Sequence, residues 1–290
     1  MFTITKQPQT EPVYILNDTD TQSSVTIYPD RGGIATSWKV NDRELMYLDV
    51  DRFNEDPKLS VRGGFPILFP ICGNLPDNAY AVDGKPYSLK QHGFGRELPW
   101  TVSHQSTTTD ASLTITLTSN EATRAVYPFE FSVSFTYKLA GGQLTIDQTY
   151  TNKSTTPMPF SSGLHPYFLA PSKDSLTVEI PSASYTEKNT GETHAFAGKF
   201  DFSQAEIDAA FTTVTGTVAT VKDTSQNLTL TMTSSENYRT LVFWTVVDKN
   251  FYCLEPWTGP RNSLNTGTDL LHVAPGETLS TSVTFAAKFA

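Results

Sequence analysis

The sequence predicts an all-β fold, a sandwich of large antiparallel sheets. Apolar and polar residues alternate in five stretches, with threonine and serine at most outward positions: 113–117, 131–139, 144–150, 176–180 and 228–232. Such alternation is typical of strands with one buried and one solvated face, as in antiparallel sheets. Two turns between these and neighbouring strands, Asp83-Gly84 and Gly141-Gly142, predict hairpins.

Helical periodicity is scarce along the 290 residues. Only 120–126 and 203–210 have the pattern of short helices, and the first ends before Pro128. Roughly fifteen short strands without crossover helices favour a sandwich over an α/β sheet. No repeat and no low-complexity linker divides the chain, so we expect one domain over residues 1–290.

Composition narrows the classes of partner. The net charge is −9 and no basic cluster occurs, which argues against nucleic acid. No apolar run approaches the roughly 18 residues of a membrane span, and the N-terminus lacks the regions of a signal peptide. We therefore expect a cytoplasmic protein that does not bind membranes. Cys72 and Cys253 belong to no C-x-x-C pair and are expected to be buried, reduced thiols.

Several kinds of catalytic site lack their motifs in this chain. The histidines and acids do not have the short spacings of metal ligands, so we expect no metal. No glycine-rich loop opens a helix, which argues against a nucleotide cofactor. No G-x-S-x-G motif occurs either. The chain therefore lacks the sequence motifs expected for hydride transfer, for phosphoryl transfer from nucleotides and for serine hydrolysis.

Two of the five histidines stand out. His92 lies in QHGFGRELPW, where Gly93 and Gly95 allow the backbone to pack closely. His165 follows a predicted strand in SSGLHPYF, an apolar setting in which an imidazole needs a hydrogen-bond partner. Each could equally be a core histidine bonded to a backbone carbonyl. The other three are predicted to be solvated at the surface: His104, His194 and His272.

Glu255 and Arg62 are charged residues in apolar segments. The predicted strand 251–254 runs directly into Glu255, and Trp257 follows. Such a carboxylate is expected to be partly desolvated, which raises its pKa and its basicity, although a salt bridge with Arg261 is the plainer alternative. Arg62 precedes two glycines in VRGGFPILFP and could instead cap a strand or pair with an acid.

Four segments in one order resemble the aldose 1-epimerase family: RGGFPILFP, QHGFGR, SGLHPYF and LEPW, followed by GPRNSLN. The resemblance runs from about residue 12 to the end, so that residues 1–11 are expected to be peripheral. It is greatest to the shorter branch that includes glucose-6-phosphate 1-epimerases. It implies a β-supersandwich with an open cleft that holds a sugar. It also implies a cofactor-independent isomerase that interconverts the α and β anomers of an aldohexose or hexose 6-phosphate.

The resemblance further implies roles for individual residues. His165 corresponds to the family's general acid and Glu255 to its general base. The substrate contacts that it implies are a second histidine, two arginines of the sugar-phosphate branch and an aspartate in EIDAAF: His92, Arg62, Arg96 and Asp208. Trp257 is expected, from its place beside Glu255, to form an apolar wall against the sugar. One departure concerns an Asn-Arg pair of galactose mutarotases, which is Asn74-Leu75 here and argues against plain galactose specificity.

Ring opening requires a proton to leave the anomeric hydroxyl while another reaches the ring oxygen. A carboxylate and a protonated imidazole can perform both transfers. We therefore expect a starting state with Glu255 ionised and His165 charged. The two arginines suit a phosphate, but they suit sugar hydroxyls nearly as well. The alternatives are a non-catalytic sugar-binding protein and a polysaccharide lyase or glycosidase, of which a glycosidase would need a carboxylate pair.

Overall fold

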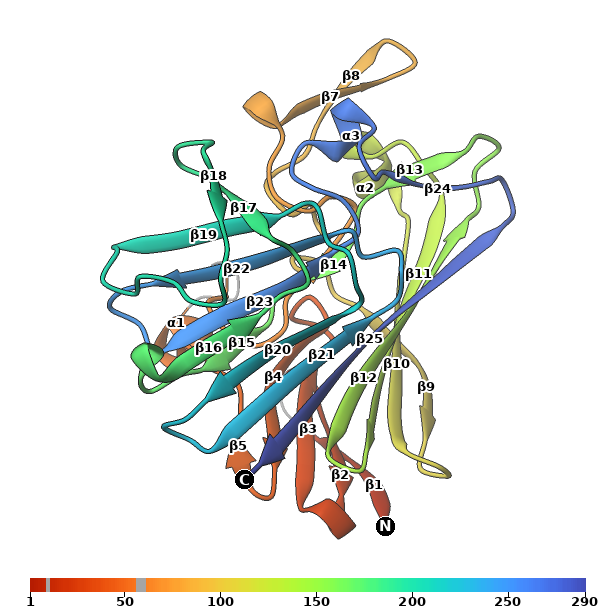
Figure 1. Ribbon diagram of the computed structural model, residues 1–290. Coiled ribbons are helices and arrows are strands. Elements are labelled where there is room, and N and C mark those ends of the chain that lie inside the picture. Colours follow the sequence, from red (N-terminus) through yellow and green to blue (C-terminus); the bar gives the residue numbers. More distant parts are fainter. Residues whose placement is uncertain (9–10, 56–60) are drawn as a thin grey trace.

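The computed structural model describes all residues except 9–10 and 56–60, and its architecture is almost entirely β (Figure 1). The all-β prediction is confirmed. Helical segments are short and lie between strands: α1 (Val50–Glu55), α2 (Glu121–Val126), α3 (Ser263–Thr266) and the 3-10 turns η1 (Thr19–Thr21), η2 (Pro76–Asn78) and η3 (Lys173–Ser175). Among the described residues, no helix is both long and apolar enough to cross a membrane.

The first large sheet has eight antiparallel strands and contains most of the alternating stretches. Its order is β16-β20-β21-β25-β12-β11-β10-β9. The alternating side chains of β11 and β12 are buried on one face, and the Gly141-Gly142 turn joins the two strands, as predicted. The strands are β9 (Thr101–Ser106), β10 (Ala111–Thr118), β11 (Phe131–Ala140), β12 (Gln143–Asn152), β16 (Leu176–Glu179), β20 (Val218–Asp223), β21 (Leu228–Ser234) and β25 (Thr278–Phe289).

The second eight-stranded sheet holds the candidate site. Its main order is β18-β17-β19-β22-β23-β14-β6, and β15 pairs with β23 beside β14 (Figure 1). These strands are β6 (Ile67–Leu68), β14 (Gly163–Leu164), β15 (Tyr167–Leu169), β17 (Ser184–Glu187), β18 (Thr193–Ala195), β19 (Glu206–Phe211), β22 (Thr240–Val246) and β23 (Phe251–Trp257).

The remaining strands form one five-stranded sheet and two pairs. The five-stranded sheet runs in chain order from β1 to β5, so β1 is one of its two edge strands. The β7–β8 pair is the hairpin predicted at Asp83-Gly84. The strands are β1 (Phe2–Gln7), β2 (Val13–Asp18), β3 (Ser23–Tyr28), β4 (Ile34–Val40), β5 (Arg43–Glu44), β7 (Ala79–Val82), β8 (Lys85–Ser88), β13 (Met158–Phe160) and β24 (Leu271–Val273).

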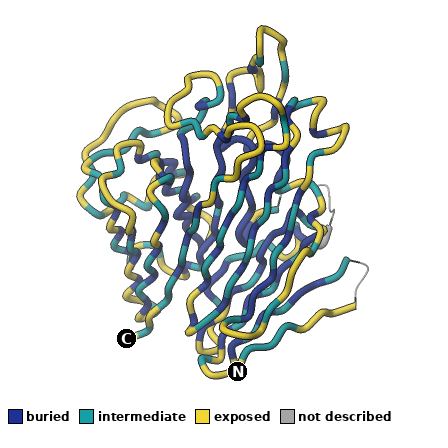
Figure 2. The backbone as a smooth tube through the Cα atoms, turned by 90° about the vertical axis from the view of Figure 1, so that its right-hand side faces the viewer, coloured by how far each residue is buried: buried dark blue, intermediate teal, exposed yellow. Residues whose placement is uncertain are grey.

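One continuous apolar core joins the three large sheets. Trp38 of β4, Phe135 of β11 and Phe243 of β22 belong to the same buried cluster. Figure 2 shows the consequence, with buried segments along the strands and exposed ones in the loops. The prediction of one domain is not tested directly, but this shared core favours it. Both cysteines are free and buried, and His104, His194 and His272 are exposed, as predicted.

The helix predicted over 203–210 is wrong, because this segment contains β19. That strand is an inner strand, paired with β17 on one side and β22 on the other. Its residues 207–209 are all buried, so the apolar residues do not alternate. Because the strand is buried on both faces, its short sequence EIDAAF shows no two-residue alternation and cannot be told from a helix by periodicity alone. The helix predicted over 120–126 is confirmed, with Asn120 and Thr123 forming a capping box at the start of α2.

The QHGFG segment packs closely against the strand residues near Phe69, as expected from its glycines. Gly93 has a φ of +65°, and a Cβ there would lie 2.3 Å from the Phe69 carbonyl oxygen. The Phe69 carbonyl accepts hydrogen bonds from the N–H groups of Phe94 and Gly95. Because no side chain fits in this space, the close contact that holds His92 in place requires glycine.

We expect Gly93→Ala to destabilise the fold more than Gly141→Ala. Both glycines have positive φ, so both substitutions should cost about 1–2 kcal/mol from the left-handed backbone alone. A Cβ at Gly141 meets no atom within 4 Å, whereas the clash at Gly93 should add about 1–3 kcal/mol. Chemical denaturation of both variants measures the difference, and equal losses would contradict the packing described here.

Candidate active site

All seven residues predicted for the site line one cleft of about 290 Å³. They come from segments that are far apart in the sequence and meet at the second eight-stranded sheet: Arg62, His92, Arg96, His165, Asp208, Glu255 and Trp257. The sequence prediction of a shared cleft thus agrees with the structure, while the chemical role of each residue stays a prediction.

Pairing along β23 sets His165 opposite Glu255. Gly163 of β14 pairs with Trp257, and Tyr167 of β15 pairs with Cys253, so His165 lies between two contacts with the same strand. The backbone N–H of His165 donates to the Pro66 carbonyl. At Gly163 a Cβ would lie 2.7 Å from the Pro256 carbonyl oxygen, so this approach also depends on glycine.

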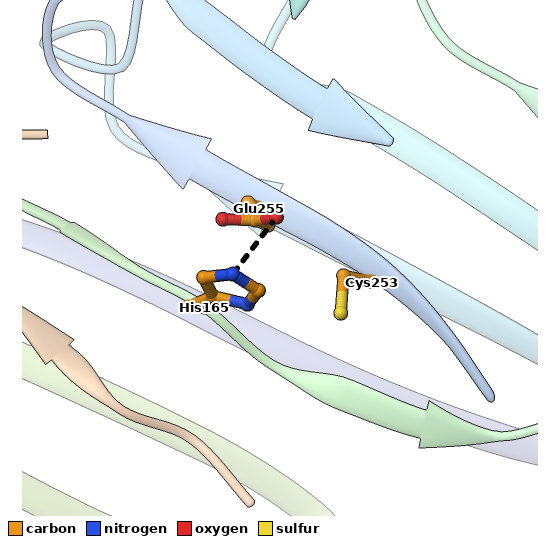
Figure 3. Close-up of side chains that lie close together, drawn as sticks. All are labelled: His165, Cys253 and Glu255. Carbon is orange, nitrogen blue, oxygen red and sulfur yellow. Dashed lines mark ion pairs between the residues drawn. The ribbon is translucent and has the colours of Figure 1, made fainter. Parts of the chain in front are cut away.

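The His165 and Glu255 side chains point toward one another (Figure 3). Nε2 of His165 lies 3.5 Å from Oε1 of Glu255. The other carboxylate oxygen, Oε2, accepts a hydrogen bond of 3.1 Å from the indole N–H of Trp257. The His165 ring stacks on Tyr167 at a centroid distance of 4.8 Å. Both side chains are therefore held in defined orientations on the wall of the cleft.

Burial opposes charge on both members of this pair. Desolvation, reinforced by the positive charge of Arg96, lowers the pKa of His165 to about 3. Desolvation and the nearby Asp208 raise the pKa of Glu255 well above its ordinary value, against the opposing effect of Arg261. The raised pKa of Glu255 agrees with the sequence prediction. Burial thus favours the neutral pair in the protein without a sugar, and the charged pair expected at the start of the reaction stays a prediction.

His92 presents a neutral imidazole to the cleft. Its Nδ1 accepts a hydrogen bond of 3.0 Å from the Gly73 N–H, so the ring proton is on Nε2. Burial, and next the neighbouring His165, lower the pKa of His92 well below its ordinary value. The ring centroids of His92 and His165 are 5.6 Å apart. The Nε2 atom lies 3.2 Å from the Gln91 side-chain amide, so its N–H can donate either to the oxygen of that amide, once the amide is turned round, or to a substrate.

Asp208 does not stand free in the cleft. Its carboxylate accepts hydrogen bonds from Nη2 of Arg261, at 3.1 and 2.9 Å, and Lys188 Nζ lies 3.2 Å from its Oδ2. The salt bridge that the sequence suggested between Glu255 and Arg261 is thus made by Asp208 instead. Arg62 and Arg96, by contrast, form no ion pair with any residue that the structure describes.

Sequence reasoning did not find a metal-ligand group that the fold assembles. His165, Cys253 and Glu255 each place one potential ligand atom within 4.8 Å of the others (Figure 3). Burial raises the pKa of the Cys253 thiol well above its ordinary value, and the thiolate, not the thiol, is the effective ligand. The chemistry of these donors therefore fits a metal poorly and favours proton transfer between His165 and Glu255.

Several cleft residues were not singled out as site residues from the sequence: Gln91, Tyr167, Lys188, Glu206, Trp244 and Arg261. Trp244 donates its indole N–H to Glu206 at 2.7 Å, so these two side chains orient each other. Gln91 and Tyr167 flank predicted residues in the QHGFGR and GLHPYF motifs, which was a usable signal. Lys188 and Glu206 carry no local signal, because only strand pairing brings them to the cleft.

Comparison with known proteins identifies the family. The family model described as Aldose 1-epimerase matches residues 13–286. The chain belongs to the aldose 1-epimerase family. The β-supersandwich fold and a sugar as the small-molecule ligand follow from this membership, since aldose 1-epimerases interconvert sugar anomers.

This aldose 1-epimerase family member is similar to one solved structure and to several curated proteins. The Slr1438 protein from Synechocystis is 43% identical over 100% of both chains, with a TM-score of 0.95. The plasmid protein LacX from Lactococcus lactis is 27% identical over 82% of this chain and 86% of its own length. A putative glucose-6-phosphate 1-epimerase from Escherichia coli is 31% identical, but this match spans only 48% of this chain and 42% of that protein.

We expect Glu255→Gln to stabilise the fold near neutral pH. The folded pKa of Glu255 is raised, so the unfolded chain loses this proton first and stability falls as the pH rises from about 4.5 through the folded pKa. The loss is about 1.4 kcal/mol for each unit between the two pKa values. Thermal unfolding should therefore show a gain for Glu255→Gln at pH 7 that shrinks at pH 4. The exposed Glu130→Gln variant serves as control, and an equal gain in both variants would contradict the burial argument.

Proposed function

We propose that this protein interconverts the α and β anomers of an aldohexose or hexose 6-phosphate by opening and reclosing the sugar ring. The observation that carries the proposal is the His165–Glu255 pair, 3.5 Å apart on the wall of a sugar-sized cleft. Membership of the aldose 1-epimerase family supports the same reaction class. The roles below rest on this pair and its surroundings.

In the proposed mechanism, Glu255 removes the proton of the anomeric hydroxyl while His165 protonates the ring oxygen. The C1–O5 bond then breaks and leaves an open-chain aldehyde. Rotation about the C1–C2 bond exposes the other face of the aldehyde. Reclosure reverses both proton transfers, so the enzyme returns to its starting state without a cofactor or covalent intermediate. His92 donates its Nε2 proton to the substrate, and Trp257 forms the wall beside C1 while its N–H holds Glu255.

The neutral pair and the reactive charged pair contain the same number of protons. They differ only in whether the proton is on Glu255 or on His165, whose atoms lie within 3.5 Å of each other. A sugar hydroxyl that donates to Glu255 stabilises its carboxylate and thereby favours the form with the proton on His165. Substrate binding can therefore produce the reactive form without exchanging protons with solvent.

Two cleft arginines support a phosphorylated substrate. Arg62 is exposed, whereas Arg96 is partly buried and, among the residues that the structure describes, donates only from Nη2 to the Gln91 carbonyl. The Nε atom of Arg96 is buried without a partner among the described residues. Guanidinium groups with free N–H donors match phosphate oxygens, and these two are not neutralised by an ion pair with described residues. This favours a hexose 6-phosphate over a free hexose.

We expect the protein to accelerate anomer exchange of glucose 6-phosphate or glucose, measured by polarimetry or exchange NMR. His165→Ala and Glu255→Gln should each lower kcat by about 10²–10⁴-fold, because each removes one proton transfer. His272→Ala, at an exposed histidine outside the cleft, is the matched control. A wild type that binds sugar but never exceeds the buffer rate would support the alternative, a non-catalytic sugar-binding protein.

The phosphate preference has its own test. The wild type should have a higher kcat/KM for glucose 6-phosphate than for glucose, and Arg62→Ala and Arg96→Ala should each reduce this ratio by about 10–100-fold. Arg124→Ala, on the exposed face of α2, should leave the ratio unchanged. If both cleft variants lower the two substrates equally, the arginines do not bind phosphate.

A further inference from the structure

Arg261 is a cleft residue whose hydrogen-bond donors the proposed reaction leaves unused. It follows β23 in the GPRN segment and lines the same cleft as Glu255. Its Nη2 atom is fixed by both oxygens of Asp208, which is itself buried and also paired with Lys188. The guanidinium carbon lies 5.0 Å from the centroid of the Trp257 ring. Arg261 is thus held rigidly, next to the residue that holds the proposed base.

The remaining donors of this guanidinium have no partner. Nε carries one N–H and Nη1 carries two, and neither atom has a hydrogen-bond acceptor among the described residues although both are buried. Buried polar groups are nearly always hydrogen-bonded, because an unpaired donor loses its water without compensation. Buried, fixed and unpaired donors on the wall of a cleft indicate an acceptor that the chain does not supply.

The backbone at Gly73 leaves room for the Arg261 side chain. Gly73 has a φ of +69°, and a Cβ there would lie only 2.3 Å from Cγ of Arg261. The stem of Arg261 therefore crosses the chain at Gly73, where no side chain obstructs it. The guanidinium at the end of this stem lines the cleft together with Glu255 and Trp257.

We propose that Arg261 determines sugar specificity by donating hydrogen bonds to ring hydroxyls of the substrate, and that Asp208 positions Arg261. This inference rests on the proposed function. The Asp208 carboxylate holds Nη2, so the N–H groups on Nε and Nη1 keep fixed directions that suit hydroxyl oxygens, whereas Arg62 and Arg96, which form no ion pair with described residues, suit a phosphate. The rigid planar fork matters here, since a lysine would keep the charge toward Asp208 but lose the Nε and Nη1 donors.

Sugar binding tests the proposal without relying on catalysis. The affinities of D-glucose and its 2-, 3-, 4- and 6-deoxy analogues are measured by calorimetry or by the fluorescence of the cleft tryptophans, Trp244 and Trp257. The wild type should bind at least one of the 2-, 3- and 4-deoxy sugars about 10–100-fold more weakly than glucose. Arg261→Lys should bind glucose and that deoxy sugar equally weakly. Arg124→Lys, on α2, is the matched control and should keep the wild-type discrimination.

The outcomes separate this proposal from the proposed function. If Arg261→Lys still discriminates among the sugars as the wild type does, or if the wild type binds none of them, the proposal is overturned. If the wild type discriminates and Arg261→Lys does not, the proposal holds even when neither protein accelerates anomer exchange, and only the proposed function fails.

Asp208→Asn provides a second variant should Arg261→Lys fail to fold, since it loosens the guanidinium without removing it. It should weaken discrimination against the same deoxy sugar, and an unchanged pattern would contradict the proposal.

Discussion

The pairing of β23 with the two short strands β14 and β15 is the constraint on which the rest of the site depends. It fixes the backbone on both sides of His165 against the strand that carries Glu255. The side chains then face each other at 3.5 Å in surroundings that exclude most water. Their burial is unfavourable for two ionisable groups, and the large core shared by three sheets supplies the stability that offsets it.

The exclusion of water also explains why His165 and Glu255 suit proton transfer better than a permanent ion pair. In the absence of a sugar, desolvation favours an uncharged imidazole and an uncharged carboxyl group. Charges that develop when a sugar hydroxyl is deprotonated are felt more strongly here than in water. The Asp208 group acts at longer range, because its own negative charge raises the pKa of Glu255 while its partner Arg261 lowers it. The proton affinity of the proposed base thus depends on a salt bridge that it does not join.

Much of the fold could be predicted from the sequence because strands with one wet face alternate visibly. The strand β19 was not predicted because it is paired on both sides and its residues 207–209 are all buried, so apolar and polar positions do not alternate along it. The seven site residues could be predicted because they lie in motifs that resemble one family. The protonation of His165 could not, because it depends on how far tertiary packing removes water from the ring. The partner of Arg261 was missed for a related reason, since Asp208 is 53 positions away in the chain and only strand order brings it near.

Gly73 links two parts of the cleft that are separate in the sequence. Its N–H fixes the ring of His92, its carbonyl accepts from the His92 backbone, and its missing side chain gives passage to Arg261. The contacts of this one residue therefore set both the orientation of the His92 imidazole and the position of the Arg261 guanidinium in the cleft. Under the roles proposed for His92 and Arg261, substrate preference and anomeric chemistry are therefore not independent of each other. A redesign that moves this turn to admit a different sugar also moves the imidazole beside the proton-transfer pair.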